Sequence, residues 1–224
     1  MVSAILLAAG SGKRLNSPVA KPLIKIGGKP LVFYSLAVLN EHPAIDEIIM
    51  VANRANRKAI AAIINKYSFK KVKSLVLGGL RRQDSVYNGL QAVSGKSKLV
   101  LIHDSARPFV QPGSITKVIE EAKIYGAAIL AVKPKATIKG SGPGNLVNKT
   151  FDRNKLWEVQ TPQVFKKEII LAAFKKYSRD TVTDDASLVE RSGKKVKIVE
   201  GTYGNIKITT NEDLKFAQWN IKPA

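Results

Sequence analysis

The chain has 224 residues, no cysteine and a hydrophobic content of 45%. This length and composition are typical of one folded domain with a buried core, and they exclude an intrinsically disordered chain. The lack of cysteine excludes disulfide bonds and thiolate metal sites. No apolar run approaches the length of a membrane span, and the first residues lack the basic segment of a secretion signal. We therefore expect a cytoplasmic protein that does not bind membranes.

The charge is strongly positive, with 37 Lys and Arg against 17 Asp and Glu, a formal net charge of +20. One interpretation is nucleic-acid binding, because clustered cations release counterions from a phosphate backbone. The other is a lysine-rich solvated surface together with a site for anionic substrates. Aromatic residues make up only 7% of the chain and are not interleaved with the basic runs, so platforms for stacking bases are not evident. We favour the second interpretation and do not expect a nucleic-acid partner.

Apolar segments of strand length alternate with amphipathic segments, which is the pattern of an α/β fold. Strands are predicted at residues 4–9, 47–52, 74–77, 99–102, 127–132, 196–199 and 205–208. Helices are predicted at residues 30–42, 57–67, 83–93, 112–125, 167–177 and 185–191, with a closing helix from residue 211. The fold class expected is a Rossmann-like, mostly parallel sheet with helices on both faces.

Residues 133–156 interrupt this alternation. Their middle is rich in glycine, with Gly140, Gly142 and Gly144 around Pro143, and the flanking segments alternate without enough apolar residues for a core. The pattern predicts a protruding β-hairpin arm with a glycine-rich tip. We expect one domain over residues 1–224 that carries this single arm.

The predicted first strand ends in a glycine turn followed by cations. Gly10 and Gly12 free the backbone to curl and let a ligand approach its N–H groups. Lys13, Arg14 and Lys21 then supply fixed positive charge, so the stretch suits a polyphosphate. The spacing fits neither a Walker loop, which needs four residues between its glycines, nor a dinucleotide fingerprint, which needs a third small residue.

Other polar candidates lie at residues 79–85 and 104–107, each after a predicted strand, and at Thr161. Each alone has a plain structural explanation, such as a cap or a strand-ending turn. Ligands of open α/β sheets bind outside the carboxyl ends of the strands, and these segments and the glycine turn converge on that edge. We interpret their convergence as a binding site, and His103 as a strand-end residue rather than a catalytic one.

The motifs resemble a known enzyme family. Leu-Ala-Ala-Gly-Ser-Gly-Lys-Arg at residues 7–14, followed by Lys21-Pro22, resembles the signature of nucleotidyltransferases that join a nucleoside triphosphate to a phosphorylated sugar or polyol. Motifs that narrow the resemblance lie at residues 103–109 (HDSARPF), 152–157 (DRNKLW), 160–163 (QTPQ), 183–187 (TDDAS) and 205–209 (NIKIT). As a set, in this order, they resemble the 2-C-methyl-D-erythritol 4-phosphate cytidylyltransferases, a family with the fold of nucleotide-diphospho-sugar transferases.

The resemblance implies transfer of CMP from CTP to 2-C-methyl-D-erythritol 4-phosphate, with release of pyrophosphate. The attacking phosphate is already mostly dianionic, since its second pKa is about 6, so the reaction needs charge neutralisation rather than a general base. Mg²⁺ is expected as the cofactor, bound mainly through the CTP phosphates.

The resemblance also implies roles for individual residues. It implies catalytic roles for Arg14, Lys21 and Lys207. It implies contacts to the nucleotide by Ala8, Ala9, Gly10, Gly12, Gly79, Ser85, Asp104 and Ser105. It implies contacts to the polyol phosphate by Asp104, Arg107, Thr137, Arg153, Thr161, Thr183 and Lys207. Thr137 and Arg153 lie at the two roots of the arm and would reach the site of a second subunit, which implies a homodimer.

Two alternatives stay open. A ribitol-5-phosphate cytidylyltransferase shares the glycine loop and a similar aspartate motif, although Ser105-Ala106 and the residues at 152–154 favour the methylerythritol enzyme. A non-catalytic, basic nucleic-acid-binding protein on the same fold is the other. The chain also departs from the family at Pro22, where glutamine is common, and at Leu80, where an acidic residue is common.

Overall fold

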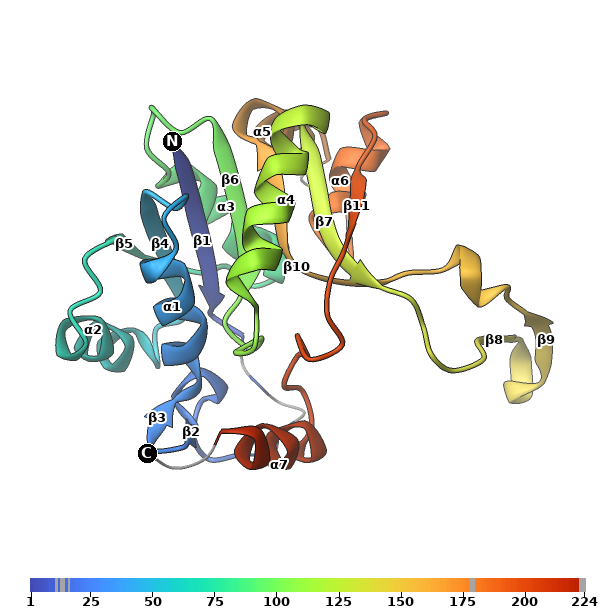
Figure 1. Cartoon of the computed structure of the whole chain (residues 1–224), viewed down its shortest axis with the longest axis horizontal. Helices are drawn as coiled ribbons and strands as arrows, with labels where there is room; N and C mark the ends of the chain where they lie inside the picture. The colour runs from blue at the N-terminus through green and yellow to red at the C-terminus, as the bar shows by residue number, and fades with distance from the viewer. Residues whose placement is uncertain (11, 13–14, 16, 178–179, 222–224) are drawn as a thin grey trace.

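The computed structural model describes residues 1–10, 12, 15, 17–177 and 180–221. These residues form a central sheet of seven strands in the order β11-β7-β10-β6-β1-β4-β5 (Figure 1). The strands are β1 (Val2–Ala8), β4 (Glu47–Ala52), β5 (Val72–Leu77), β6 (Leu99–Asp104), β7 (Ala127–Val132), β10 (Glu158–Lys166) and β11 (Lys197–Glu200). Strand β10 is antiparallel to its neighbours β6 and β7, and the other neighbouring pairs are parallel. The mostly parallel sheet predicted from the sequence is confirmed.

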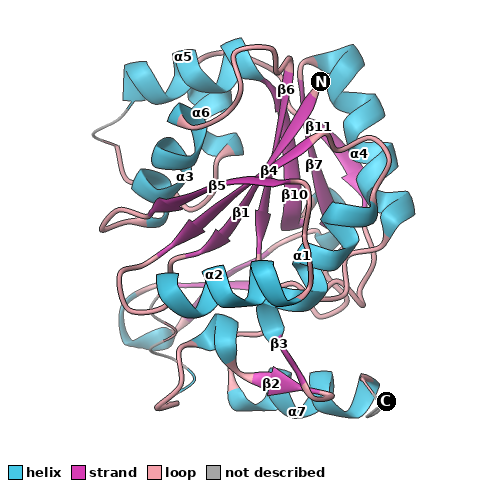
Figure 2. Ribbon diagram, turned by 90° about the vertical axis from the view of Figure 1, so that its left-hand side faces the viewer, coloured by secondary structure: helices cyan, strands magenta, loops and turns pink. Residues whose placement is uncertain are grey.

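Helices cover both faces of the sheet (Figures 1 and 2). They are α1 (Leu31–Glu41), α2 (Arg57–Lys66), α3 (Arg82–Gln91), α4 (Pro112–Tyr125), α5 (Lys167–Tyr177), α6 (Ala186–Arg191) and α7 (Asn211–Asn220). Side chains of α1, α2 and α4 pack into the core on one face, and those of α3, α5 and α6 pack into the core on the other. Both helix layers were expected from the alternating pattern of the sequence.

Strand β1 shows why the first apolar run is continuous. Its Ala4, Leu6 and Ala8 side chains belong to the core under α1 and α4, whereas Ile5 and Leu7 belong to the core under α3 and α5. A strand that is covered on both faces has no polar side to present, so it lacks the alternation of a half-exposed strand. Its place inside the sheet, between β6 and β4, puts Gly10 and Gly12 at the carboxyl edge.

Strand β10 was not predicted. Its sequence contains Gln160, Thr161 and Pro162, and proline seldom sits in a central strand because it cannot donate to the ladder. In the structure the pairing of β10 with β7 shifts register between Val159 and Gln163, and Pro162 lies within that irregularity. The strand then carries polar side chains into the middle of the sheet.

The predicted strand at residues 205–208 is wrong. This segment pairs with no strand among the described residues, and it crosses the carboxyl end of the sheet instead. The N–H of Ile208 donates to the carbonyl of Ala106, with 2.8 Å between nitrogen and oxygen. The crossing brings Lys207 over the end of β6.

A small third layer closes this end of the molecule. The hairpin of β2 (Lys25–Ile26) and β3 (Lys29–Pro30), also not predicted, packs with α7 around a cluster that includes Ile26, Ile208 and Ala217. Helix α7 begins with a capping box, in which the Thr210 hydroxyl accepts a hydrogen bond from the N–H of Asp213. The short 3-10 helix η2 (Lys21–Leu23) connects the glycine turn to the hairpin.

The arm projects away from the rest of the chain (Figure 1). Strands β8 (Lys139–Ser141) and β9 (Val147–Thr150) pair antiparallel around the 3-10 helix η3 (Pro143–Asn145), and η4 (Arg153–Lys155) follows. Gly144 at the tip has a φ of +70°, a conformation that glycine adopts without strain. The predicted hairpin is therefore present. None of the described helices is long and apolar enough to cross a membrane.

Candidate active site

Two adjoining pockets lie at the carboxyl edge of the sheet. The larger, of about 420 Å³, is lined by Leu7, Ala8, Ala9, Gly10, Gly12, Lys21, Pro22, Gly79, Leu80, Arg81, Arg82, Ser85, Asp104, Ser105, Ala106 and Lys207. The smaller, of about 400 Å³, is lined by Arg82, Asp104, Arg107, Val159, Gln160, Thr161, Gln163, Thr183, Asp184, Ser187, Glu190 and Lys207. Arg82, Asp104 and Lys207 line both pockets and form the wall between them.

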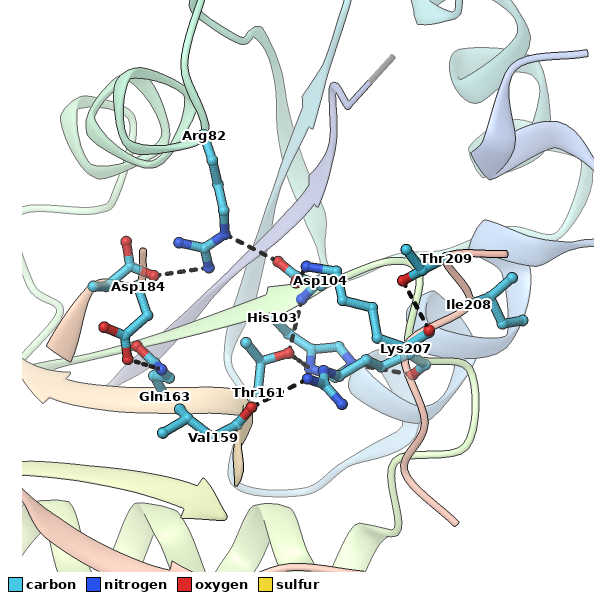
Figure 3. A network of polar contacts seen from close by, with 12 residues as sticks. Arg82, His103, Asp104, Val159, Thr161, Gln163, Asp184, Lys207, Ile208 and Thr209 are labelled. Atoms are coloured by element: carbon cyan, nitrogen blue, oxygen red, sulfur yellow. Dashed lines mark hydrogen bonds and ion pairs between the residues drawn. The ribbon is translucent and has the colours of Figure 1, made fainter. Parts of the chain in front are cut away.

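The wall is a chain of alternating charges. Lys207 Nζ lies 2.5 Å from Asp104 Oδ2, and Arg82 Nε lies 3.3 Å from Asp104 Oδ1. The same guanidinium places its Nη2 2.9 Å from Oδ2 of the fully buried Asp185, at the start of α6. Figure 3 shows Arg82 and Lys207 approaching the Asp104 carboxylate from opposite sides. Cations from α3 and from the C-terminal segment are thus held at the end of β6.

These contacts set the ionisation of the wall. Burial alone would raise the pKa of Asp104, but the positive charges of Arg82, Lys207 and Arg107 outweigh it and hold that pKa well below its usual range. Burial raises the pKa of Asp185, and Arg82 opposes the rise only in part. Asp104 is therefore a permanent anion near neutral pH. It offsets part of the charge of the two cations and fixes where they lie.

His103 supports the wall from beneath. The N–H of Asp104 donates to Thr161 Oγ1 at 3.1 Å, and the Thr161 hydroxyl lies 2.9 Å from His103 Nδ1. His103 Nε2 donates to the carbonyl of Arg107 at 3.3 Å. A carbonyl can only accept, so the hydrogen of the neutral ring is on Nε2 and Nδ1 accepts from the Thr161 hydroxyl. Burial, with a contribution from Arg107, lowers the pKa of His103 to about 4, so the ring is neutral. Its place at the end of β6, away from both pocket linings, agrees with a strand-end role.

The loop after β5 forms one side of the larger pocket. The N–H of Gly79 donates to Ser85 Oγ at 3.1 Å, and the Ser85 hydroxyl donates to the carbonyl of Arg81 at 3.3 Å. A Cβ atom at Gly79 would lie 2.3 Å from the Cβ of Asp84, so this turn has no room for a side chain. Leu80 follows with its side chain fully exposed at the pocket.

Lys21 lines the same pocket. It opens the 3-10 helix η2, and its Nζ donates to the carbonyl of Ile208 at 2.9 Å. Gly12 has a φ of +66°, and a Cβ atom there would lie 3.0 Å from the Cβ of Lys21. The glycine turn therefore packs directly against the lysine stem, which places a cation beside the end of β1.

The smaller pocket is built on β10 and α6. The Arg107 guanidinium donates through Nη1 to the carbonyl of Asn205 at 2.6 Å, and its buried Nε has no hydrogen-bond partner in the described part of the chain. Gln163 donates to Asp184 Oδ2 at 2.8 Å and accepts from the N–H of Ala186 at 3.1 Å. These bonds fix the segment that carries Thr183 against the sheet.

Comparison with known proteins assigns the family. The family model described as 2-C-methyl-D-erythritol 4-phosphate cytidylyltransferase matches residues 2–222. The chain belongs to this family.

Individual relatives agree. The 2-C-methyl-D-erythritol 4-phosphate cytidylyltransferase of Geobacillus kaustophilus (strain HTA426) is 48% identical over 217 residues, 96% of this chain and 94% of the relative. The crystal structure of 4-diphosphocytidyl-2C-methyl-D-erythritol synthase from Anaerococcus prevotii DSM 20548 has a TM-score of 0.88 at 38% identity. The match covers 98% of this chain and 95% of the Anaerococcus chain. The structure of the cytidylyltransferase from Francisella tularensis has a TM-score of 0.80 at 32% identity, with 97% and 98% covered. The chain is accordingly a nucleotidyltransferase, and its reaction is the CTP-dependent cytidylyl transfer of isoprenoid precursor synthesis.

The structure brings together most of the residues that the family resemblance singled out. The larger pocket is lined by Ala8, Ala9, Gly10, Gly12, Lys21, Gly79, Ser85 and Ser105. The smaller is lined by Arg107, Thr161 and Thr183. Asp104 and Lys207 line both. Thr137 and Arg153 line neither, because they lie in the arm, where Arg153 Nη1 donates to the carbonyl of Lys135. Arg14, like Lys13, lies outside the described residues.

The sequence did not reveal Arg82 or its partner Asp185. Arg82 immediately precedes the helix predicted from residue 83, and a cation at such a position is usually solvated. Asp185 was assigned to the start of the next-to-last helix, where an aspartate most simply caps the helix. Only the folded chain shows that the two side chains meet, 103 residues apart, behind the wall.

The donor set of the larger pocket is suited to a metal ion that arrives with its nucleotide. Of the described residues that line it, Asp104 is the only carboxylate, and cations occupy both of its oxygens. The described residues also contain no cluster of three or more His, Asp or Glu that could hold a metal ion. Magnesium commonly retains waters and bridges substrate phosphates, so a magnesium ion in this pocket would be held mainly through the nucleotide.

Proposed function

We propose that the larger pocket receives CTP, that the smaller one receives 2-C-methyl-D-erythritol 4-phosphate, and that the two phosphates meet at the Arg82–Asp104–Lys207 wall. The observation that carries this proposal is that two pockets, each of a size for a small polar ligand, share these three residues. The position of Lys21 and the glycine turn on the larger side supports triphosphate binding there.

In this arrangement a phosphate oxygen of the polyol attacks the α-phosphorus of CTP. A new phosphorus–oxygen bond forms, the bond from the α-phosphorus to the bridging oxygen breaks, and pyrophosphate leaves with the electron pair. No proton has to be removed, because a phosphate monoester is mostly dianionic near neutral pH. Lys21 and Lys207, with Arg14, would offset the charge that builds on the α-phosphate and on the leaving group. Asp104 would keep Lys207 and Arg82 at the wall between the two bound substrates.

Bound Mg²⁺ would add further neutralisation of the triphosphate. The chain would contribute by receiving the complex between Lys21 and the backbone of the glycine turn, while the Gly79–Ser85 loop would contact the base. Arg107, Thr161 and Thr183 would hold the polyol phosphate on the other side. The assignment of these residues to the nucleotide and to the polyol phosphate rests on the family resemblance and on the residues that line each pocket.

The arm is proposed to complete the site of a second subunit. The hairpin extends away from its own pockets, and Thr137 and Arg153 are exposed on it. Leu146 and Val147 are also exposed near its tip, and apolar side chains in that position are suited to burial against another chain. A two-fold homodimer would exchange the arms reciprocally. A cytoplasmic location likewise stays a prediction from the sequence.

The assignment of substrates to pockets is tested by a split in Michaelis constants. Thr183→Val keeps the side-chain volume and removes a hydroxyl from the smaller pocket, so we expect a higher KM for the polyol phosphate and an unchanged KM for CTP. Ser85→Ala should do the reverse, because it releases the Gly79 loop of the larger pocket. Equal shifts in both constants, or shifts of the opposite kind, would contradict the assignment.

A further inference from the structure

We infer that Asn53 and Asn56 are positioning residues for the nucleotide, which orient two backbone N–H groups at the end of β1 toward the larger pocket. The inference rests on the proposed binding of CTP in that pocket. The two asparagines lie in the turn after β4, the neighbour of β1, and neither of them lines either pocket.

The asparagine pair is locked by its own backbone. The N–H of Asn53 donates to Asn56 Oδ1 at 3.0 Å, and the N–H of Asn56 donates to Asn53 Oδ1 at 2.9 Å. These reciprocal bonds occupy the oxygen of each side-chain amide. Each amide turns its NH₂ group to the neighbouring strand, whose carbonyls can only accept.

Both NH₂ groups reach the last carbonyls of β1. Asn56 Nδ2 donates to the carbonyl of Ala8 at 2.8 Å, and Asn53 Nδ2 donates to the carbonyl of Ala9 at 3.1 Å. The bonds span 48 and 44 residues, so they are not local turn contacts. They join the turn after β4 to the point where the apolar strand becomes the glycine turn at Gly10.

The two asparagine bonds also fix the direction of two backbone N–H groups. A trans peptide is planar, with its N–H opposite its C=O, so fixing the carbonyls of Ala8 and Ala9 also fixes the N–H groups of Ala9 and Gly10. Those N–H groups are directed away from the asparagines. Ala9 and Gly10 line the larger pocket, and neither N–H donates to an acceptor among the described residues. Two neighbouring N–H groups without an acceptor in the described part of the chain are available to acceptor atoms of a ligand in this pocket.

If the two asparagines only stabilised the fold, their substitution would lower stability without a specific effect on nucleotide affinity. The bond from Asn53 to Ala9 is only partly buried, so in Asn53→Ala water can satisfy that carbonyl and folding should change little. Asn56 is 1% exposed and its bond to Ala8 is buried, so Asn56→Ala should also lower stability. The peptide groups beside Gly10 would then be free to rotate, and binding would have to order them again. For Asn53→Ala the cost should therefore fall on nucleotide affinity rather than on stability.

The first test uses Asn53→Ala and Asn56→Ala, with Asn88→Ala as the matched control. Asn88 also donates from its amide to a strand-end carbonyl, that of Leu77 on β5, at 2.9 Å, but it is exposed and lines neither pocket. We expect each of the first two variants to raise the Kd for CTP about tenfold, the size of effect that follows from weakening one hydrogen bond between a backbone N–H and a charged ligand. The KM for the polyol phosphate and both constants of Asn88→Ala should stay within twofold. A Kd for CTP within twofold of wild type in a folded variant would overturn the positioning role.

The second test does not depend on any variant folding. In the ¹H–¹⁵N spectrum of the labelled wild-type chain, the amide signals of Ala9 and Gly10 should shift on addition of CTP. Parallel additions of cytidine and of inorganic tripolyphosphate show whether the base or the phosphates supply the acceptors. If both signals stay fixed while that of Gly79 moves, the inference is wrong.

A third variant separates this inference from the proposed function. If Lys21→Ala leaves the Kd for CTP unchanged, the assignment of CTP to the larger pocket fails. If Lys21→Ala weakens CTP binding and the Asn53 and Asn56 variants do not, the pocket assignment stands and the positioning role fails.

Discussion

Lys207 Nζ lies 2.5 Å from Asp104 Oδ2, although 103 residues separate the two in the chain. This contact ties the segment before α7 to the end of β6, and Arg82 occupies the other carboxylate oxygen. The cations that we propose to face the two anionic substrates are therefore both held by the buried Asp104, and Arg82 is held by Asp185 as well. Their placement does not have to wait for substrate, which is the preorganisation that charge-stabilising sites require.

The first prediction concerns Asp104→Asn. The amide keeps the shape of the side chain but loses the charge that holds Lys207 and Arg82, so kcat/KM should fall by about 10²–10³. Asp46→Asn is the control, because the Asp46 carboxylate accepts from the N–H of Val2 at the opposite edge of the sheet. Steady-state pyrophosphate release measures both. Activity of folded Asp104→Asn within threefold of wild type would show that the wall needs no anion.

The second prediction is a strong preference for CTP over UTP. The two bases differ at one exocyclic position, an amine in cytosine and a carbonyl in uracil. A pocket that pairs with one leaves a buried polar group unmatched by the other, so discrimination should be large. We expect the Gly79–Ser85 loop to supply this contact. Comparable kcat/KM values for the two nucleotides would contradict a base-reading role for the loop.

The third prediction concerns the pH dependence of stability. Because the pKa of His103 is lowered to about 4 from an ordinary 6.5, the unfolded chain binds the proton more tightly. The stabilisation by the neutral ring is complete above pH 6.5, and it is lost as the pH falls from 6.5 to about 4, by up to about 3 kcal/mol. Denaturant unfolding of wild type and His103→Gln at several pH values measures this. The free energy of unfolding of His103→Gln should not show this loss between pH 6.5 and 4. If it fell with pH in parallel with that of wild type, the buried neutral histidine would be contradicted.

The fourth prediction concerns the arm. Inactive Lys21→Ala and Arg153→Ala chains are unfolded and refolded together. If sites are shared, a mixed dimer joins an intact Lys21 core to an intact Arg153 arm at one of its two sites. Random pairing makes about half of the dimers mixed, so about a quarter of wild-type activity should return. If each arm served its own chain, every site would retain a lesion, and confirmed mixed dimers would show no recovery.

The parts of the fold that the sequence predicted are those with local signals. Strand β4 and helix α4 have the predicted bounds, because a short apolar run and a proline-initiated amphipathic segment are strong patterns. Strand β10 lacks such a pattern, since its buried side chains include Gln160 and Thr161 and it contains Pro162. The segment at residues 205–208 has the alternation of a strand but crosses the sheet edge, where its bonds go to the loop after β6.

The site was predicted unevenly for the same reason. The residues of the glycine turn and of the loop after β6 stand in short motifs, so the sequence placed them at one edge. The pairing of Arg82 with Asp185 and the Asn53–Asn56 clamp depend on strand order and on side-chain direction, which no local pattern encodes. Tertiary contacts of this kind became visible only in the folded chain.

The central claim is that the two pockets catalyse cytidylyl transfer to 2-C-methyl-D-erythritol 4-phosphate, and the most direct test is product analysis. The purified chain is incubated with CTP, Mg²⁺ and either this polyol phosphate or ribitol 5-phosphate, with Lys21→Ala as the blank. Pyrophosphate release is measured, and the nucleotide product is identified by mass. We predict pyrophosphate and 4-diphosphocytidyl-2-C-methyl-D-erythritol in equal amounts, far above the blank and above the ribitol reaction. Faster transfer to ribitol 5-phosphate, or activity of Lys21→Ala equal to wild type, would contradict the account.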